Sequence, residues 1–330
     1  MQTQSRIRRR LHGIDVEVVC DAPDAAAVVD RRLSFFPPFD QEPSISIELC
    51  TDRLPEAHKR PSDGRIVHES ENVSIVYSDR IDELWVDYRG GSFAHCRPAE
   101  GQGSIYVTRA DDAWPWIASR PLLTVSLLEL LKRRSLFGVH AAAVAHAGRG
   151  VMLAGSTGSG KSTASLALLL GGWSFLGDDI VFLRDTPGEA VLLAFPDEID
   201  ASDETIQFFP ALGALSDWPR LAGYAKRQLS PEIVRAGGTV LSATPGLVLL
   251  PRIGGMDSHE LEPVAPDELL LELIPNVILT EQAAAQTQLD QLAELARRTP
   301  AYRVTLGRRV GALQAILEDL LERTPANGST

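Results

Sequence analysis

The chain has few cysteines, no long hydrophobic run and no excess of basic residues. Its 330 residues include only Cys20, Cys50 and Cys96, with no C-x-x-C spacing among them. This scarcity excludes a disulfide framework and a typical zinc site, so we expect three buried free thiols. The formal net charge of −12 argues against a nucleic-acid-binding protein, because such proteins usually carry a basic surface.

Membrane and targeting signals are also missing from the sequence. The longest largely apolar stretch, residues 164–177, covers about 14 residues and is too short to span a bilayer. Residues 1–10 are polar and end in a basic cluster, with no apolar segment after them, so they do not resemble a signal peptide. We therefore expect a cytoplasmic protein that has no membrane partner.

The most informative segment is a phosphate-binding loop. Residues 155–162 satisfy G-x-x-x-x-G-K-[ST], the Walker A or P-loop motif. The apolar run 151–154 predicts a strand before the loop, and the run 163–170 predicts a helix after it, which is the context that the motif requires. We therefore predict that ATP is bound by the following residues: Gly155, Ser156, Thr157, Gly158, Ser159, Gly160, Lys161, Ser162 and Thr163.

The residue types in the loop match this chemistry. Glycines let backbone N–H groups turn inward around phosphate oxygens, and the helix N-terminus adds a partial positive charge. Lys161 is expected to reach the β- and γ-phosphates, and the Ser162 hydroxyl is expected to ligate Mg²⁺. The alternative is a glycine-rich turn without a ligand.

Two adjacent carboxylates follow the loop at short range. Asp178 and Asp179 interrupt an apolar, strand-like run, and Asp178 lies 17 residues after Lys161. Burying a carboxylate without a partner costs free energy, and Mg²⁺ bound with ATP would offset that cost. We therefore expect the pair beside the γ-phosphate; the alternative is a Gly-Asp-Asp surface turn.

The stretch from His140 to Leu183 resembles the catalytic core of HPr kinase/phosphorylase, a family that shares its P-loop architecture with phosphoenolpyruvate carboxykinase. In that family a histidine-bearing strand precedes the P-loop, one short helix follows, and the next strand carries an Asp-Asp pair, as in this chain. The resemblance implies an α/β fold with a P-loop kinase core of the HPr-kinase type. It also implies transfer of the ATP γ-phosphate to a serine hydroxyl, with Asp178 as the base and Ser162, Asp178 and Asp179 around Mg²⁺.

Two signatures of HPr kinases are missing. No E-x-R-G-x-G segment follows the acidic strand, where residues 195–203 read FPDEIDASD, and the Pro-Gly-Arg-Asn loop is absent. These departures count against HPr as the acceptor and against phosphorylase activity. The chain looks more like divergent relatives encoded beside ribosomal-peptide biosynthesis genes, some of which phosphorylate a peptide serine. The acceptor stays open among a peptide, a protein and a small molecule that bears a hydroxyl.

Periodicity predicts the domain organisation. Residues 1–118 are expected to form a β-rich N-terminal domain, 119–323 a P-loop kinase-like domain and 324–330 a loose tail. Period-two alternation and apolar spacing predict the elements. The strands are expected at 15–20, 44–49, 73–77, 83–88, 246–251 and 302–306, and the helices at 122–131, 267–274, 282–298 and 310–323.

Several charged residues are weaker candidates. His140 is expected to contact phosphate or Asp178, or else to be a satisfied core histidine. Arg252 follows a predicted strand and is either a charge stabiliser for the transferring phosphoryl group or a solvated arginine. Lys226 and Arg227 either bind an acidic group or form a solvated face. The acidic cluster at 197–200 is interpreted as a helix N-terminus.

Two functional classes remain. The first is a serine kinase, and the second is a nucleotide-binding regulatory ATPase that phosphorylates no acceptor; carboxykinase-like chemistry is a third, less supported option. The sequence lacks the N-K-x-D motif of many GTPases and the L-S-G-G-Q signature of ABC-type ATPases. The short spacing between the P-loop and Asp178 favours the kinase. Proteins of the family that this chain resembles often form closed assemblies, so the sequence leaves open whether the protein forms a homo-oligomer.

Overall fold

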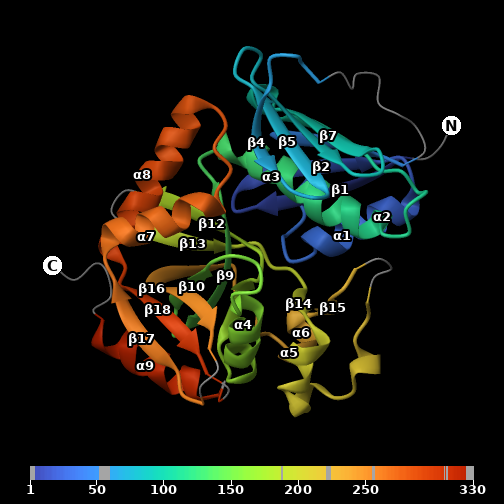
Figure 1. Ribbon diagram of the computed structural model, residues 1–330. Coiled ribbons are helices and arrows are strands. Elements are labelled where there is room, and N and C mark those ends of the chain that lie inside the picture. The colour runs from blue at the N-terminus through green and yellow to red at the C-terminus, as the bar shows by residue number, and fades with distance from the viewer. Residues whose placement is uncertain are drawn as a thin grey trace. The chain divides into compact units, whose positions relative to one another are not determined.

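The computed structural model describes residues 4–51, 60–186, 189–220, 224–254, 257–307, 309 and 311–324 (Figure 1). Contacts within the chain divide it into two compact units. The first unit comprises Met1–Leu136 and Ile278–Ala285, and the second comprises Phe137–Val277 and Gln286–Thr330. The fold is of the mixed α/β class, as the sequence predicts.

The first unit is built on one mixed sheet, in the strand order β1-β2-β3-β8-β7-β6-β5-β4. Helices α1 (Pro23–Leu33), α2 (Trp114–Ile117) and α3 (Leu123–Lys132) accompany it. The predicted strands at 15–20, 44–49, 73–77 and 83–88 are confirmed within one residue at either end. The strands are β1 (Ser5–Leu11), β2 (Ile14–Cys20), β3 (Ile45–Cys50), β4 (Arg65–Glu69), β5 (Val73–Ser78), β6 (Glu83–Tyr88), β7 (Ser92–Arg97) and β8 (Gln102–Tyr106).

Helix α3 belongs to the first unit, whereas the predicted domain boundary after residue 118 assigns it to the second. Its apolar side chains pack on β7 and β8. A buried cluster at its end also fastens a distant segment to this unit. The Lys132 ammonium donates to Glu129 Oε2 (2.9 Å), to Thr280 Oγ1 (2.9 Å) and to the Ile278 carbonyl (2.6 Å).

The second unit contains the sheet that positions the phosphate-binding loop. Its strand order is β10-β9-β12-β13-β16-β18-β17, with β11 added beside β9. β10 pairs with β16, and β16 pairs with β18, in parallel. The strands are β9 (Phe137–His146), β10 (Arg149–Ala154), β11 (Ser174–Gly177), β12 (Ile180–Thr186), β13 (Glu189–Ala194), β16 (Ser242–Ile253), β17 (Glu260–Val264) and β18 (Ala301–Leu306).

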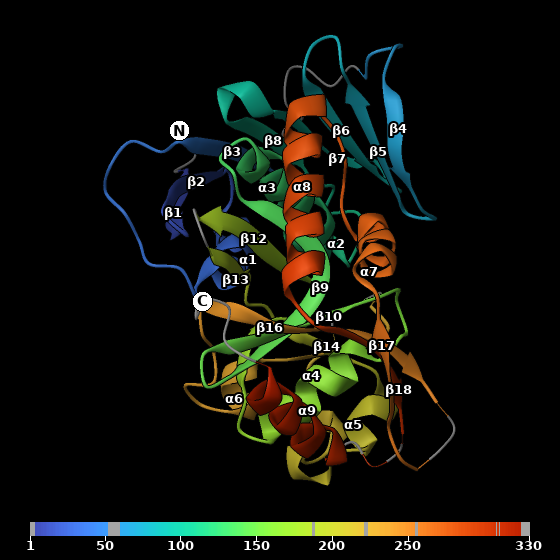
Figure 2. The same cartoon turned by 90° about the vertical axis from the view of Figure 1, so that its left-hand side faces the viewer.

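Alternating apolar residues on β9 bury both faces of this sheet. Ala141 and Ala143 contribute to the core beneath α7 (Pro266–Leu273) and α8 (Gln282–Arg298), and Ala142 and Val144 to the core beneath α4 (Lys161–Leu170) and α9 (Ala312–Arg323). Figures 1 and 2 show these two pairs of helices on opposite sides of the sheet. The predicted helices at 267–274 and 282–298 and both predicted strands in this unit are confirmed. The last helix begins at Ala312; residue 310, where it is expected to start, and residues 325–330 of the expected tail lie outside the described residues.

An insertion between β13 and β16 packs against α4 and against the neighbouring strand β11. It holds β14 (Ile199–Ala201), α5 (Asp203–Gln207), β15 (Arg227–Leu229) and α6 (Pro231–Val234). Its own apolar core includes Ile206 and Trp218, and this core reaches Leu166 and Leu169 of α4. The insertion therefore lies next to the helix that follows the P-loop.

The buried cysteines give a direct test of the packing of the first unit, in which all three lie. Burial raises the pKa of Cys20 and of Cys96 to about 12, and Cys50 is also buried. Because the thiolate is the reactive species, we expect none of the three thiols to react quickly with a disulfide reagent at pH 8 in the native protein. All three should react within seconds in concentrated guanidinium. One equivalent of rapid reaction before denaturation would contradict the fold around that cysteine.

Candidate functional site

The site lies where three strands end at the same edge of the second unit's sheet. β10, β16 and β18 run parallel, so the P-loop after β10 meets Ile253–Gly254 at the end of β16 and Leu306–Gly307 at the end of β18. Crevices at the carboxyl ends of parallel strands are the usual ligand sites of α/β sheets. Here the crevice is a cavity of about 410 Å³, within the range of small-molecule sites.

The P-loop takes the conformation that its glycines allow. Gly158 and Gly160 have φ values of 83° and 102°, which residues with side chains rarely adopt. A Cβ on Gly160 would lie 2.6 Å from Leu306 Cδ1, so a side chain at this position would also have to displace the Leu306 side chain. The Lys161 ammonium donates to the Gly155 carbonyl (2.6 Å) and to the Ser156 carbonyl (3.2 Å). Burial lowers the pKa of Lys161, while Asp179 and Asp178 act in the opposite direction.

Asp178 lies beneath the first turn of α4 and contacts the P-loop serine. Ser162 Oγ donates to Asp178 Oδ2 at 2.8 Å, and the Asp200 amide donates to the same oxygen at 3.2 Å. The side chain is almost fully buried. Asp178 Oδ1 is buried and has no hydrogen-bond partner in the part of the chain that the structure describes. Burial is the main cause that raises the pKa of Asp178 to about 7, although the Ser162 bond lowers it.

Asp179 points to a different neighbour. His140 Nδ1 lies 3.0 Å from Asp179 Oδ1, and both side chains are partly exposed (37% and 45%). The β9–β12 register aligns His140 with Ile180, and the Ala141 amide donates to the Asp179 carbonyl at 3.1 Å. The expected contact from His140 to Asp178 is therefore wrong: the partner of His140 is Asp179.

The two aspartates diverge because the chain bends between two strands. β11 ends at Gly177 and β12 begins at Ile180. A Cβ on Gly177 would lie 2.6 Å from the Ile180 carbonyl oxygen, so glycine permits this tight bend. The apolar run that the sequence predicts as one strand is therefore two strands, and Asp178 and Asp179 lie between them.

The residues around Ser162 suit a Mg²⁺ ion, although Asp178 and Asp179 do not both face the same point. Hydroxyl and carboxylate oxygens are the ligands that Mg²⁺ prefers, and the Asp178 Oδ1 atom is buried with no partner among the described residues. Over those same residues, no cluster of three His, Cys, Asp or Glu side chains is placed to hold a metal. Of the predicted metal residues, the structure brings Ser162 and Asp178 together and turns Asp179 towards His140.

Arg252 does not reach the cavity. Its guanidinium donates from Nε to Thr305 Oγ1 at 2.7 Å, and Nη2 lies 3.8 Å from Glu262 Oε1. Because successive strand residues point to opposite faces, Ile253 lines the cavity and Arg252 points away.

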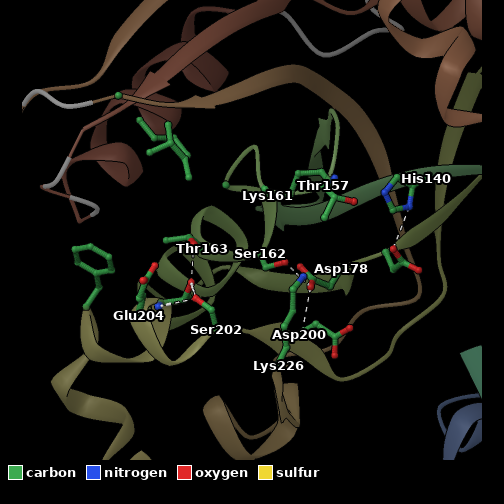
Figure 3. A pocket seen from close by; sticks show the side chains of 18 of the residues that line it. His140, Thr157, Lys161, Ser162, Thr163, Asp178, Asp200, Ser202, Glu204 and Lys226 are labelled. Atoms are coloured by element: carbon green, nitrogen blue, oxygen red, sulfur yellow. Dashed lines mark hydrogen bonds and ion pairs between the residues drawn. The ribbon is translucent and has the colours of Figure 1, made fainter. Parts of the chain in front are cut away.

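The insertion supplies site residues whose place the sequence does not reveal. Figure 3 shows Lys226 extending towards the Ser162–Asp178 pair, with Asp200 beside it. Asp200 lies on β14, and Tyr224 donates to its carboxylate. The interpretation of the 197–200 cluster as a helix N-terminus is wrong, because α5 begins at Asp203 after its N-cap Ser202. Nothing in the local pattern indicates that β14 runs under Asp178.

The comparisons with known proteins give a distant likeness to solved structures. No protein-family model matches the chain, and no curated protein matches it. Among solved structures, the chain is similar to the HPr(Ser) kinase/phosphatase from Coxiella burnetii, with 13% identity, 56% of this chain and 93% of that chain covered, and a TM-score of 0.29. No helix in the described ranges has the length and apolar character needed to cross a membrane.

The burial of Asp178 predicts a pH-dependent stability. The pKa of Asp178 is about 7 in the folded chain against an ordinary value of 3.8, so the folded state binds more protons between these values. The stabilising contribution of the protonated group is present at low pH and is lost as the pH rises through 7. Asp178→Asn cannot ionise at this position. As the pH is raised from 5 to 8, we therefore expect its free energy of unfolding to increase by about 3 kcal/mol relative to that of the wild type. Urea unfolding in the presence of a chelator measures the free energy of unfolding at each pH. The same change with pH in wild type and in Asp178→Asn would contradict the prediction.

Proposed function

We propose that this protein is a kinase that transfers the γ-phosphate of Mg·ATP to the hydroxyl of a peptide, protein or small-molecule acceptor. The observation that carries the proposal is the 2.8 Å bond from the P-loop residue Ser162 to the buried Asp178, beneath the loop that holds Lys161. A Walker A serine beside a buried carboxylate is the usual way in which P-loop proteins hold the metal of a nucleoside triphosphate. ATP as the phosphate donor agrees with the cytoplasmic location that the sequence predicts.

The P-loop and the buried pair would bind the donor. The backbone N–H groups of residues 155–162 would surround the phosphates, and Lys161 would lie against the β- and γ-phosphates. Ser162 and Asp178 would hold Mg²⁺, whose charge offsets the negative charge of the phosphates when it is bound. The uncompensated Asp178 Oδ1 atom would then have a partner.

The geometry favours Asp179 as the base, a division of roles that differs from the one implied by the resemblance. Asp178 already accepts two hydrogen bonds on Oδ2 and is almost fully buried, so an acceptor hydroxyl has little access to it. Asp179 is 45% exposed and lies 3.0 Å from His140. The Asp179 carboxylate would take the proton of the acceptor hydroxyl as the hydroxyl oxygen attacks the γ-phosphorus, and the bond from that phosphorus to the β,γ-bridging oxygen would break, so that ADP leaves. His140 would orient the Asp179 carboxylate.

Lys226 is a better candidate for the charge stabiliser than Arg252, which the sequence leaves open between that role and a solvated arginine. It lines the cavity, whereas Arg252 points away from it. Lys161 and Lys226 are close enough that the charge on Lys226 adds to burial in lowering the pKa of Lys161. Two cations around a transferring phosphoryl group stabilise the charge on its oxygens.

Labelled ATP incubated with serine peptides and small hydroxyl compounds tests the reaction itself. A kinase places the label on an acceptor, and wild-type protein that releases only free phosphate with every acceptor would favour the regulatory ATPase.

In Lys161→Ala, we expect most nucleotide affinity to be lost while the circular dichroism spectrum and melting temperature stay close to wild type. Wild-type ATP affinity in the folded Lys161→Ala variant would refute the proposal that the P-loop binds ATP.

The two aspartates should separate in their kinetic effects. Asp178→Asn should raise the Mg²⁺ concentration required for half-maximal ATP binding, because it removes a negative charge beside the ion. Asp179→Asn should keep that Mg²⁺ dependence and lose phosphoryl transfer by roughly two to four orders of magnitude, the range for a positioned base. Titrations and single-turnover transfer for both variants decide the matter. Normal transfer by Asp179→Asn, with transfer lost in Asp178→Asn at saturating Mg²⁺, would restore the base role to Asp178.

Lys226 and Arg252 form a matched pair of substitutions. Lys226→Ala should lower the rate of transfer at saturating ATP by about tenfold or more, since it removes a positive charge near the transferring group. Arg252→Ala, near the end of β16 but outside the cavity, tests the alternative placement of that charge. A loss confined to Arg252→Ala would contradict the assignment to Lys226.

A further inference from the structure

The cavity has two chemically different ends, and only one of them is used by the proposed reaction. Figure 3 shows His140 at one end and Glu204 with Thr163 at the other, with Ser162 and Asp178 between them. The His140 end carries Asp179, and Glu204 is a carboxylate at the other end. The Thr163 end carries exposed apolar side chains that no part of the transfer chemistry requires.

The first turn of α4 separates these two ends. Ser162 points to Asp178, whereas the neighbouring Thr163 has its hydroxyl 3.2 Å from Thr205 of α5. A Cβ built on Gly160 would lie 3.5 Å from Ile253 Cγ1. Successive side chains leave a helix in different directions, so Thr163 and Ser162 face different sides of α4. The loop after β16 and helix α5 therefore flank the same side of the P-loop, away from Asp178.

Two large apolar side chains on that side are exposed although buried positions lie next to them. Phe208 follows α5 and is 56% exposed, whereas the adjacent Phe209 packs against the apolar core of the insertion. Ile253 ends β16 and is 70% exposed, three residues after the buried Leu250. Both Phe208 and Ile253 line the cavity, together with Leu306. An exposed apolar group of this kind in a concave site marks a surface that a ligand covers.

The P-loop determines which ligand group can lie there. Lys161 and Ser162 are the residues that face the β- and γ-phosphates and the metal in a P-loop, so the γ-phosphate belongs on the Asp178 side. The rest of the nucleotide must then extend past Gly160 and Thr163, towards the apolar end. A nucleobase is a flat ring with apolar faces, and it stacks on aromatic side chains regardless of its identity.

We propose that Phe208 and Ile253, with Leu306 beside them, form the nucleobase subsite, in which the ring of the nucleoside triphosphate packs between α5 and the end of β16. The inference rests on the proposed nucleotide-dependent function and adds the place of the base. It also gives the insertion a function: α5 carries Phe208 to the P-loop, and the Thr163–Thr205 contact holds α5 there.

Equilibrium binding of ATP and of inorganic tripolyphosphate, each with Mg²⁺, tests the subsite without any acceptor. Phe208→Ala should weaken ATP roughly 5- to 100-fold, the range for loss of one stacked base, and should leave tripolyphosphate affinity unchanged. Ile253→Ala should act in the same direction with a smaller factor. Ile233→Ala, which removes an equally exposed apolar residue of the insertion outside the cavity, is the control and should change neither ligand.

A second variant keeps the test independent of folding. Phe208→Trp should retain ATP affinity within a few fold, and its added fluorescence should be quenched by ATP but not by tripolyphosphate. Equal loss of ATP and tripolyphosphate in Phe208→Ala, or no loss of either, would overturn the subsite. A rise only in the acceptor concentration needed for transfer would also overturn it, because the apolar end would then bind the acceptor. Wild-type protein that binds neither ligand would instead refute the proposed function.

Discussion

A carboxylate buried beneath a phosphate-binding loop is the interaction on which the organisation of the second unit depends. Asp178 is nearly inaccessible to water, and its burial raises its pKa to about 7. Burying a carboxylate away from water costs free energy, and hydrogen bonds from the Ser162 hydroxyl and the Asp200 amide offset part of that cost. Each of these donors requires a separate element to arrive at one point. The helix after the P-loop, the bend between β11 and β12, and the strand β14 therefore have their positions fixed together.

The division of the cavity follows from the same geometry. The side chains at the start of α4 leave the helix in different directions, so Ser162 points towards the carboxylates and Thr163 towards the insertion. Asp178 and Asp179, which suit metal and phosphate chemistry, line one part of the cavity, and the exposed apolar side chains Phe208 and Ile253 line another, near Thr163 and Glu204. A nucleotide has the same asymmetry along its length, and this correspondence connects the proposed reaction to the proposed base subsite.

Local signals made much of this structure predictable, and the parts that were missed depend on long-range pairing. The P-loop, α4 and the strand before them follow from a motif whose residues are contiguous, and the period-two strands of the first unit follow from alternation. The pairing of His140 with Asp179 was missed because it depends on the β9–β12 register. Asp200 was assigned to a helix end because its acidic neighbours suggest one, whereas its place under Asp178 depends on a strand formed with residues 227–229. Arg252 and Ile253 could be placed at a strand end from sequence, but not on opposite faces without the exact register.

The buried cluster around Lys132 has a consequence for how the protein can be divided. Lys132 and Glu129 hold Ile278 and Thr280 within the first unit, so the chain passes between the units after Leu136, after Val277 and after Ala285. Neither unit is a contiguous stretch of sequence. A single cut after Leu136 leaves the two units joined through the later crossings, and a single genetic crossover cannot exchange the phosphate-binding unit as a module. Recombination with other P-loop proteins would have to carry the segment 278–285 along with its partners on α3.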